Sequence, residues 1–502
     1  MKILWIDIDT LRADHLGCYG YLRNTSPNLD RVAREGVRFE HCYVSDAPCL
    51  PSRAALHHGR FGFHTGAINH SGSYADPYKE GPTRGFKNSA AYKKFVEVLQ
   101  KGAGLYTGTV SSFAGRHSSW WFLAGYHEVY DCGKSGGELA SEVAPKALDW
   151  LERNGAKDDW FLHFNCWDPH RGYRTPPEYG NPFEDAPIET WLTQELIDRQ
   201  RQTYGTRSAL WPRGREGEVP AREVEQIRNT DDYKVWIDGY DTGIRYADEQ
   251  IGRIFAKLEA LGVYEDTAIV ISSDHGENQG ELNVYGDHHT ADLITSRVPM
   301  IVKWPGVKPR VDNGFHYQFD IAATILELLG QDVPGRWDGV SFKDAFLAGR
   351  DEGREYLVVS QAAWSCQRAV IWDDFILIKS YMDGLKDYPE HMLFNWREDP
   401  HELNNLAESM PAKLNEGLAK LQCWIDEQMA SADVKEDPMM KVIEEGGPCH
   451  TRGRLRSFLE YYEKIGKPEI AERMREKYEG VWQYGGAGEK SEVGSRKSEV
   501  GT

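Results

Sequence analysis

The chain has 502 residues, 40% of them hydrophobic, and a formal net charge of −19 at pH 7. This length exceeds what one ordinary hydrophobic core supports, so we expect two or three domains. The acidic balance and the lack of a basic run exclude a nucleic-acid-binding protein. Because no apolar run approaches the ~20 residues of a membrane helix, we also expect no membrane partner.

The first ten residues, MKILWIDIDT, do not have the composition of a secretory signal peptide. Carboxylates follow a short apolar run, and no small-residue cleavage site is present. The 8 cysteines have no regular spacing and form no CxxC pair, which favours reduced thiols. We therefore expect a cytoplasmic protein, or a periplasmic or secreted one if a leader preceded this sequence.

The first predicted element is a buried strand over residues 3–9, with the sequence ILWIDID. Its odd positions share one face, because successive side chains of a strand alternate. Asp7 and Asp9 therefore lie together at the carboxyl end of this strand. Two such carboxylates repel each other unless a positive group lies beside them.

Three more strands and one helix are predicted before residue 350. The strands cover the apolar runs 160–167, 267–277 and 298–306. An amphipathic helix precedes the second of these runs and ends at Gly262. Strands that alternate with helices indicate an α/β fold, with a large, mixed but mostly parallel sheet flanked by helices. Ligands bind at the carboxyl ends of the strands in such sheets.

The pattern changes after residue 350, where runs of β-forming residues are separated by short turns. They predict antiparallel strands over 355–364, 367–380 and 391–396. We therefore predict a large α/β domain over residues 1–350 and a smaller C-terminal α+β subdomain, with an antiparallel sheet, over residues 351–484. Residues 485–502 repeat KSEVG and are small or charged, so we predict a disordered tail.

Residues able to bind a metal or transfer protons follow the predicted strands. Asp274 and His275 close the third strand, and with Asp9 they form a set suited to a divalent cation. His170 follows the second strand, and more basic residues lie in polar loops: Arg116, His117, His288 and His289. A single histidine is more often structural, but this group is typical of a site that handles an anion by acid–base chemistry.

Cys49 begins the stretch CLPSR, four residues before Arg53. This C-x-P-S-R pattern resembles the signature of the sulfatase family, within the alkaline-phosphatase-like superfamily. Four other stretches resemble segments of the family and occur in the same order: residues 9–44, SSDHGE, RVPMIVKWPG and MLFNWREDPHELNNLA. The resemblance covers roughly residues 2–407 and implies an alkaline-phosphatase-like fold, with catalysis in the larger domain.

The resemblance implies that Cys49 is oxidised to formylglycine by a formylglycine-generating enzyme that reads this motif. One hydroxyl of the hydrated aldehyde would attack sulfur and displace the alcohol, and deprotonation of the other would then expel sulfate as the aldehyde re-forms. Arg53 would orient the diol and stabilise its oxyanion. Asp9, Asp274 and His275 would bind one divalent cation, calcium as the family default or manganese as the alternative.

Two positions depart from the pattern that many members of the family have. Thr10 stands where they have an aspartate, and His275 stands where they have an asparagine. This arrangement resembles that of phosphonate monoester hydrolases and of some carbohydrate sulfatases. Asp7 lies too early in the strand, so we expect it not to bind the ion.

The reaction also needs one acid and one base around the sulfate. We expect His170 and His288 to face each other across it and to titrate near the ordinary histidine pKa of about 6.5. We expect four more residues to contact the substrate: Arg116, His117, His289 and Trp120. Trp121 is an alternative to Trp120. His289 also remains an alternative to His288.

Three functions follow from these residues. The first is a sulfuric ester hydrolase, acting on a sulfated carbohydrate that stacks on the paired tryptophans. The second is a phosphonate monoester or phosphodiester hydrolase on the same scaffold, which His275 favours. The third, an inactive anion-binding relative, is disfavoured because nucleophile, arginine and metal ligands are all present. The sequence leaves the sugar, the sulfate position and the oligomeric state open.

Overall fold

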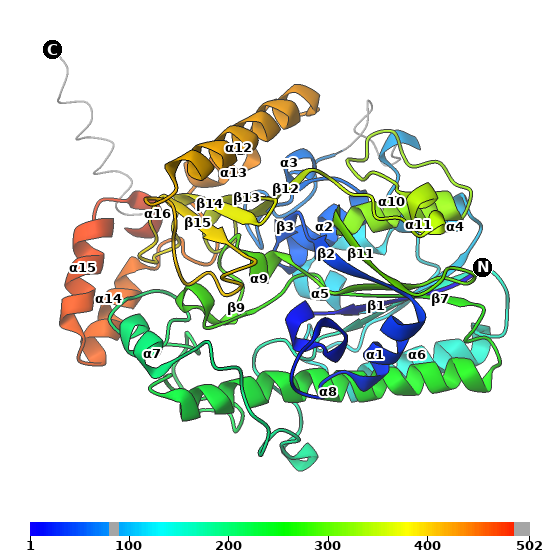
Figure 1. Cartoon of the computed structure of the whole chain (residues 1–502), viewed down its shortest axis with the longest axis horizontal. Helices are drawn as coiled ribbons and strands as arrows, with labels where there is room; N and C mark the ends of the chain where they lie inside the picture. The colour runs from blue at the N-terminus through cyan, green and yellow to red at the C-terminus, as the bar shows by residue number, and fades with distance from the viewer. Residues whose placement is uncertain (80–89, 486–502) are drawn as a thin grey trace.

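The structure is a computed structural model that describes residues 1–79 and 90–485. Figure 1 shows a large central sheet with helices on both faces and a smaller sheet beside it. The predicted disordered tail, residues 485–502, lies outside the described residues except for Gly485, which ends a short helix.

The large sheet has eight strands in the order β11-β2-β10-β7-β1-β6-β4-β5. Their bounds are β1 (Lys2–Ile8), β2 (Val37–Tyr43), β4 (Tyr106–Val110), β5 (Glu128–Tyr130), β6 (Trp160–Cys166), β7 (Thr267–Ser272), β10 (Met300–Lys303) and β11 (Arg310–Tyr317). All neighbouring pairs are parallel except those of β10, which runs antiparallel to β2 and β7. The predicted mixed, mostly parallel sheet is confirmed.

The register of the three central strands aligns their carboxyl ends. Asp7 of β1 pairs with Asn165 of β6 and with Ser272 of β7. Asp9 follows β1 directly and Asp274 comes two residues after β7, so both lie at the same edge of the sheet. This edge is where a parallel sheet places its ligands.

Helices cover both faces of the large sheet (Figure 1). One face carries α1 (Pro27–Glu35), α6 (Ala140–Asn154) and α8 (Thr230–Ala260). The other carries α2 (Cys49–His58), α4 (Phe95–Lys101), α10 (Gln318–Leu328) and α11 (Lys343–Ala348). The predicted helix ending at Gly262 is the last part of α8, and Gly262 has a φ of 70° that suits glycine.

Alternation along β1 decides which helices each side chain meets. Leu4 and Ile6 belong to the buried cluster that includes α1, α6 and α8. Ile3 and Trp5 belong to the cluster that includes α4, α10 and α11. Asp7 is also at an odd position, so it lies on the same face as Ile3 and Trp5. This is the face on which α2 packs.

The smaller sheet has five strands in the order β15-β14-β13-β12-β3. Their bounds are β3 (Asp46–Ala47), β12 (Tyr356–Gln361), β13 (Cys366–Trp372), β14 (Phe375–Met382) and β15 (His391–Asn395). The four C-terminal strands pair antiparallel, as predicted, whereas β3 joins β12 in parallel. Because β3 ends two residues before Cys49, the C-terminal sheet helps to place the start of α2.

The remaining elements are short or lie near the C-terminus. They are α3 (Gly62–Thr65), α5 (Phe113–His117), α7 (Gln194–Gln200), β8 (Asn278–Gln279), β9 (Tyr285–Asp287), α9 (Leu293–Ser296), α12 (Pro411–Ser431), α13 (Pro438–Glu444), α14 (Leu455–Lys464), α15 (Pro468–Tyr478) and α16 (Trp482–Gly485). Gly417 of α12 lies against Trp372 and Leu377 of the smaller sheet. Residues of α14 and α15 pack against Tyr204 and Leu210 of the larger part.

A search of the helices among the described residues finds none that is long and apolar enough to cross a lipid bilayer.

Candidate active site

Arg53 lies at the centre of a charged cluster, on the first turn of α2. Its Nε donates to Asp7 Oδ2 at 2.8 Å, and its Nη1 donates to Asp9 Oδ2 at 3.1 Å and to Asp274 Oδ2 at 2.5 Å. One guanidinium thus faces three carboxylates, and all four groups are buried. The helix and the two strand ends are held together through this residue.

The charges in this cluster do not balance. Burial alone would raise the pKa of Asp7, but Arg53 and His163 outweigh it and lower that pKa to about 2. Burial, reinforced by the Asp274 carboxylate, raises the pKa of Asp9 well above its ordinary value. Asp9 Oδ1 is buried and has no hydrogen-bond partner among the described residues. A buried carboxylate oxygen left unpaired is costly, so the cluster fits an added cation.

The predicted metal ligands do come together. Ligand atoms of Asp9, Cys49, Asp274 and His275 all lie within 4.8 Å of one another. Asp7 is not in this group, and its carboxylate lies against Arg53 Nε and near His163. The donor set of two carboxylates and one imidazole suits a divalent cation.

Backbone groups fix the orientation of these ligands. His275 Nδ1 lies 2.8 Å from the carbonyl oxygen of Gly276, so this nitrogen carries the proton and donates it. The lone pair on His275 Nε2 then points into the cluster, 3.2 Å from Cys49 Sγ. Asp274 Oδ1 accepts from the backbone amides of Thr10 and His275, at 3.1 and 3.0 Å.

Cys49 lies at the start of α2 and is buried against the cluster. Burial, and after it the carboxylates of Asp9 and Asp274, raise the pKa of its thiol well above the ordinary value. A thiol in this position is therefore protonated, whereas a cysteine that acts as a nucleophile needs its thiolate.

The structure separates the two adjacent histidines that follow β9. The ring of His288 lies tilted beside that of His275, with ring centres 4.1 Å apart, and its ligand atom lies within 4.8 Å of those of Cys49 and His275. His289 points elsewhere: its Nδ1 lies 2.9 Å from Thr206 Oγ1, and its ring stacks on Trp364 at 3.8 Å. His288 is therefore the one beside Cys49.

His170 and Arg116 lie on the side of the β6 end. The Arg116 guanidinium lies 4.8 Å from the ring centre of Trp167, and the ring of His170 packs edge-on against the same tryptophan at 6.0 Å. His170 Nδ1 lies 3.1 Å from the carbonyl oxygen of Arg171 and donates to it, which leaves Nε2 for another partner.

The histidines do not have the ordinary pKa that we expected. Burial, followed by Arg116 and Arg174, lowers the pKa of His170 well below its ordinary value. Burial, followed by His275, does the same to the pKa of His288. Burial therefore favours the neutral form of both rings, and their positive neighbours add to this effect.

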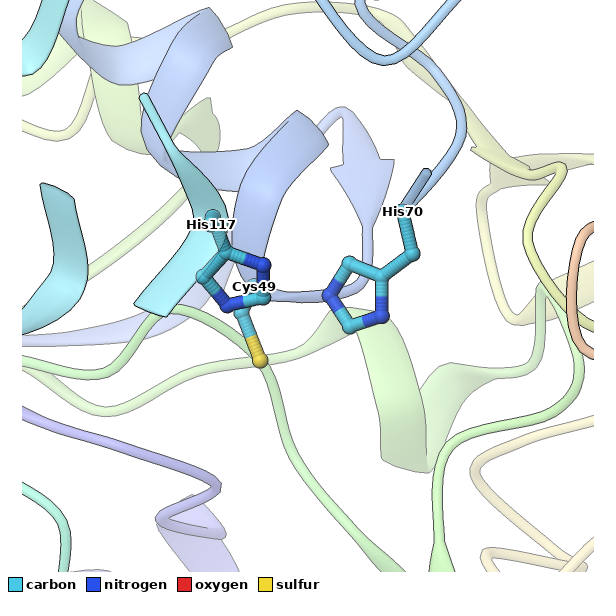
Figure 2. Close-up of side chains that lie close together, drawn as sticks. All are labelled: Cys49, His70 and His117. Atoms are coloured by element: carbon cyan, nitrogen blue, oxygen red, sulfur yellow. The ribbon is translucent and has the colours of Figure 1, made fainter. Parts of the chain in front are cut away.

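His117, at the end of α5, lies close to Cys49, and so does His70 (Figure 2). Ligand atoms of the three residues lie within 4.8 Å of one another. His70 was missed by the sequence analysis, and so was His450, whose Nε2 lies 2.9 Å from His70 Nδ1. Neither follows a predicted strand or belongs to a motif, so the sequence carries no signal for them.

Besides the predicted Trp120 and Trp121, two tryptophans that the sequence analysis did not single out lie near the site. Trp120 lies on the short 3₁₀ helix Trp120–Leu123 with its side chain 65% exposed. Trp121 packs against His58 and Phe113. Trp167 and Trp364 are the tryptophans that contact histidines of the site.

This geometry agrees with a family comparison. The family model described as Sulfatase matches residues 2–331, which is more than half of the chain. This chain belongs to the sulfatase family. A second model, described as N-sulphoglucosamine sulphohydrolase, C-terminal, matches residues 287–430. The predicted family, its alkaline-phosphatase-like fold and a hydrolase as the class of protein are confirmed.

Individual relatives are distant. An N-acetylglucosamine-6-O-sulfatase of Bacteroides thetaiotaomicron is 23% identical over 481 residues, which covers 81% of this chain and 82% of the relative. A solved structure in complex with its substrate D-glucosamine-2-N,6-O-disulfate has a TM-score of 0.68 and 19% identity, over 87% of this chain and 99% of the other. A phosphonate monoester hydrolase from Silicibacter pomeroyi has a TM-score of 0.65 and 19% identity, over 86% and 96%.

Proposed function

We propose that this sulfatase-family enzyme hydrolyses sulfate esters of carbohydrates, with a formylglycine made from Cys49 and one divalent cation. The observation that carries the proposal is the cluster in which Cys49 Sγ lies 3.2 Å from His275 Nε2, beside Asp9 and Asp274. The maturation partner would be a formylglycine-generating enzyme that reads the CLPSR stretch.

Asp9, Asp274 and His275 would hold the cation, because the unpaired Asp9 oxygen and the fixed His275 tautomer both point to a missing positive group. Once bound, a divalent cation polarises sulfate oxygens and lowers the pKa of the nucleophile. We propose calcium because two ligands are carboxylates, with manganese as the alternative because the third is an imidazole. The Thr10 hydroxyl is buried and has no partner among the described residues, so its oxygen is available to the same ion.

The chain's own residues then orient the reacting groups and move the protons. Arg53 holds Asp9 and Asp274 in place, and its positive charge, which acts on residue 49, would stabilise an oxyanion there. His288 lies beside residue 49, and its Nδ1 is buried without a partner among the described residues. We assign proton transfer at residue 49 to His288 and proton donation to the leaving oxygen to His170. Arg116 and His117 would bind the sulfate oxygens.

Two observations support a sulfated carbohydrate as the substrate. One relative is named as an N-acetylglucosamine-6-O-sulfatase, and one structural neighbour holds a sulfated glucosamine. The cluster is also bordered by aromatic and basic side chains, Trp364 and Arg116 among them, which suit a sugar with negative groups. His289 and the exposed Trp120 would contact parts of the glycan farther from the sulfate.

A phosphonate monoester or phosphodiester hydrolase remains the second candidate, favoured by His275 and by the Silicibacter pomeroyi neighbour. The test is kcat/KM for an aryl sulfate and for an aryl phosphonate monoester, measured on protein produced with the modifying enzyme. We expect the sulfate to be preferred. A clear preference for the phosphonate supports the second candidate, and turnover of neither ester identifies an inactive relative. Protein produced without the modifying enzyme is the control.

A further inference from the structure

A second pocket, with a volume of about 190 Å³, lies next to the candidate active site. Its lining comes from three distant parts of the chain and includes Arg207, Trp211, Trp364, His450 and Arg454. Figure 1 shows that the smaller sheet and the red C-terminal helices, which carry part of this lining, lie at one end of the molecule. None of these five residues was singled out from the sequence.

One chain of contacts joins this pocket to Cys49, through His450 and His70. Trp364 stacks on His289, at 3.8 Å, and on His450, at 4.4 Å. His450 Nε2 lies 2.9 Å from His70 Nδ1, and His70 in turn has a ligand atom within 4.8 Å of Cys49 Sγ. The side chain of His450 therefore separates the pocket from the residues that surround the nucleophile. This spacing suits the next sugar of a bound oligosaccharide.

The pocket contains hydrogen-bond donors that have no acceptor. Arg207 Nε donates to Asp287 Oδ2 at 3.0 Å, but its Nη1 is buried and has no partner among the described residues. The indole nitrogens of Trp211 and Trp364 are also buried without a described partner. Leaving three such N–H groups unpaired is unfavourable, so an acceptor-rich ligand is expected to satisfy them.

The lining of the pocket carries positive side chains, of which Arg207 is paired with Asp287, a residue outside the lining. Arg454 is exposed, and no carboxylate of the described residues forms an ion pair with it. The lining has two arginines and no aspartate or glutamate. An arginine fork binds a carboxylate or sulfate through charge-assisted hydrogen bonds, which are stronger than those between neutral groups.

We propose that this pocket binds a second anionic group of the substrate, a carboxylate or a sulfate on the sugar next to the one that is hydrolysed. Arg207, Trp211 and Trp364 would donate to its oxygens, and Arg454 would supply a second charge. The substrate class is then a polyanionic glycan and not a neutral one with a single sulfate. This inference rests on the proposed function, because it takes the Cys49 cluster as the place where the first sulfate binds.

The test compares inhibition constants of three probes against hydrolysis of 4-nitrophenyl sulfate. The probes are one glucosamine 6-sulfate–uronate disaccharide, its uronate methyl ester, and that ester with a 2-sulfate on the uronate. The two probes with a second anionic group, the free acid and the 2-sulfated ester, are called the charged probes. In the wild-type enzyme, we expect each charged probe to have a Ki about tenfold below that of the methyl ester that carries only the 6-sulfate. Comparison of the two charged probes identifies the anionic group that the pocket prefers. A carboxylate site favours the free acid, and a sulfate site favours the sulfated ester.

Variants then connect the preference to the pocket. The ratio compared is the Ki of the methyl ester divided by the Ki of a charged probe. In Arg454→Gln it should fall from about ten to between about one and three, since a charge-assisted bond is lost. Trp364→Phe, which keeps the ring stack and removes the N–H, should reduce it about threefold. Arg452→Gln is the matched control, because Arg452 is an exposed arginine of the same segment that does not line this pocket.

Several outcomes would overturn the inference. They are equal Ki values in the wild-type enzyme, no inhibition by either charged probe, or an equal loss in Arg452→Gln and Arg454→Gln. If 4-nitrophenyl sulfate is not hydrolysed, the proposed sulfatase activity is wrong, and this result does not decide the inference about the pocket. The three dissociation constants are then measured by calorimetry on the same protein, where the same ratios decide the inference.

Discussion

The carboxyl edge of the large sheet and the wall built by the smaller sheet and the C-terminal helices differ in how they are assembled. At the edge, Asp9 and Asp274 follow two neighbouring strands, and Arg53 binds both of them. On the wall, Trp364 and His450 come from segments without a recognisable motif, and the indole N–H of Trp364 has no partner among the described residues. At the edge, nearly all polar groups have hydrogen-bond partners among the described residues, except those that would face a cation. On the wall, buried N–H groups have no acceptor among these residues.

This difference predicts two kinds of response to mutation. Removing one member of the edge leaves other buried charges unpaired, which is strongly unfavourable. Removing one member of the wall takes away a contact to a ligand and leaves the edge in place. We therefore expect large losses of turnover from edge variants and smaller, substrate-dependent changes from wall variants.

The largest effect is expected for Asp274→Ala. This change removes one proposed ligand and one acceptor of Arg53, so kcat/KM should fall by at least about a thousandfold, with loss of bound metal. Metal content by atomic emission and turnover of an aryl sulfate are measured on the same samples. Asp7→Asn is the control that should retain the ion, and full metal occupancy in Asp274→Ala would show that the ligand set is wrong.

The next effect concerns Arg53→Lys, which keeps a positive charge but loses the planar fork that meets Asp9 and Asp274. We expect kcat/KM to fall about 10²- to 10³-fold while the ion is retained. Arg34→Lys, at an exposed arginine of α1, is the matched control. Wild-type turnover in Arg53→Lys would mean that any cation at this position is sufficient.

A smaller and selective effect is expected for His170→Ala. If His170 protonates the leaving oxygen, the variant should lose about 10² more activity on a sugar sulfate than on an aryl sulfate whose phenolate leaves unaided. His288→Ala should reduce turnover of both esters alike. Equal losses on the two esters in both variants would assign the acid to another residue, His117 or His289.

The smallest of these effects tests the residue between the two regions. His70 bonds to His450 on the wall side, and its Nε2 is buried without a described partner near Cys49. We expect His70→Gln to lower kcat/KM about tenfold, as one hydrogen bond to a charged group is lost. His41→Gln, at a half-buried histidine that packs on Phe315 and Trp396, should have no effect, and equal behaviour of the two variants would contradict the assignment.

The sequence predicted the edge well because local rules determine it. Alternation along β1 and the parallel register brought Asp9 and Asp274 to one side, and the CLPSR motif placed Cys49 and Arg53 at the start of a helix. His275 joined the set because it follows Asp274 directly. The placement of Asp9 and Asp274 needed only strand ends and alternation, whereas the roles of Cys49 and Arg53 came from the family resemblance.

The wall could not be predicted in this way. His70 and His450 are 380 residues apart, and only the tertiary fold brings them together. Tryptophans look alike in sequence whether they fill the core, as Trp160 does, or border a site, as Trp364 does. The choice of Trp120 relied on a pair of adjacent tryptophans, and the histidine pKa values depend on burial that spacing does not reveal.

The central claim is that residue 49 acts as a formylglycine, and the most direct test is the mass of the tryptic peptide that contains it. Protein is produced with and without the modifying enzyme, and the modified fraction is compared with the turnover of an aryl ester in each sample. We predict that activity rises in proportion to the formylglycine fraction, and that Cys49→Ser turns over at most once. Full activity in protein whose peptide contains only unmodified cysteine, or in Cys49→Ala, would contradict the claim.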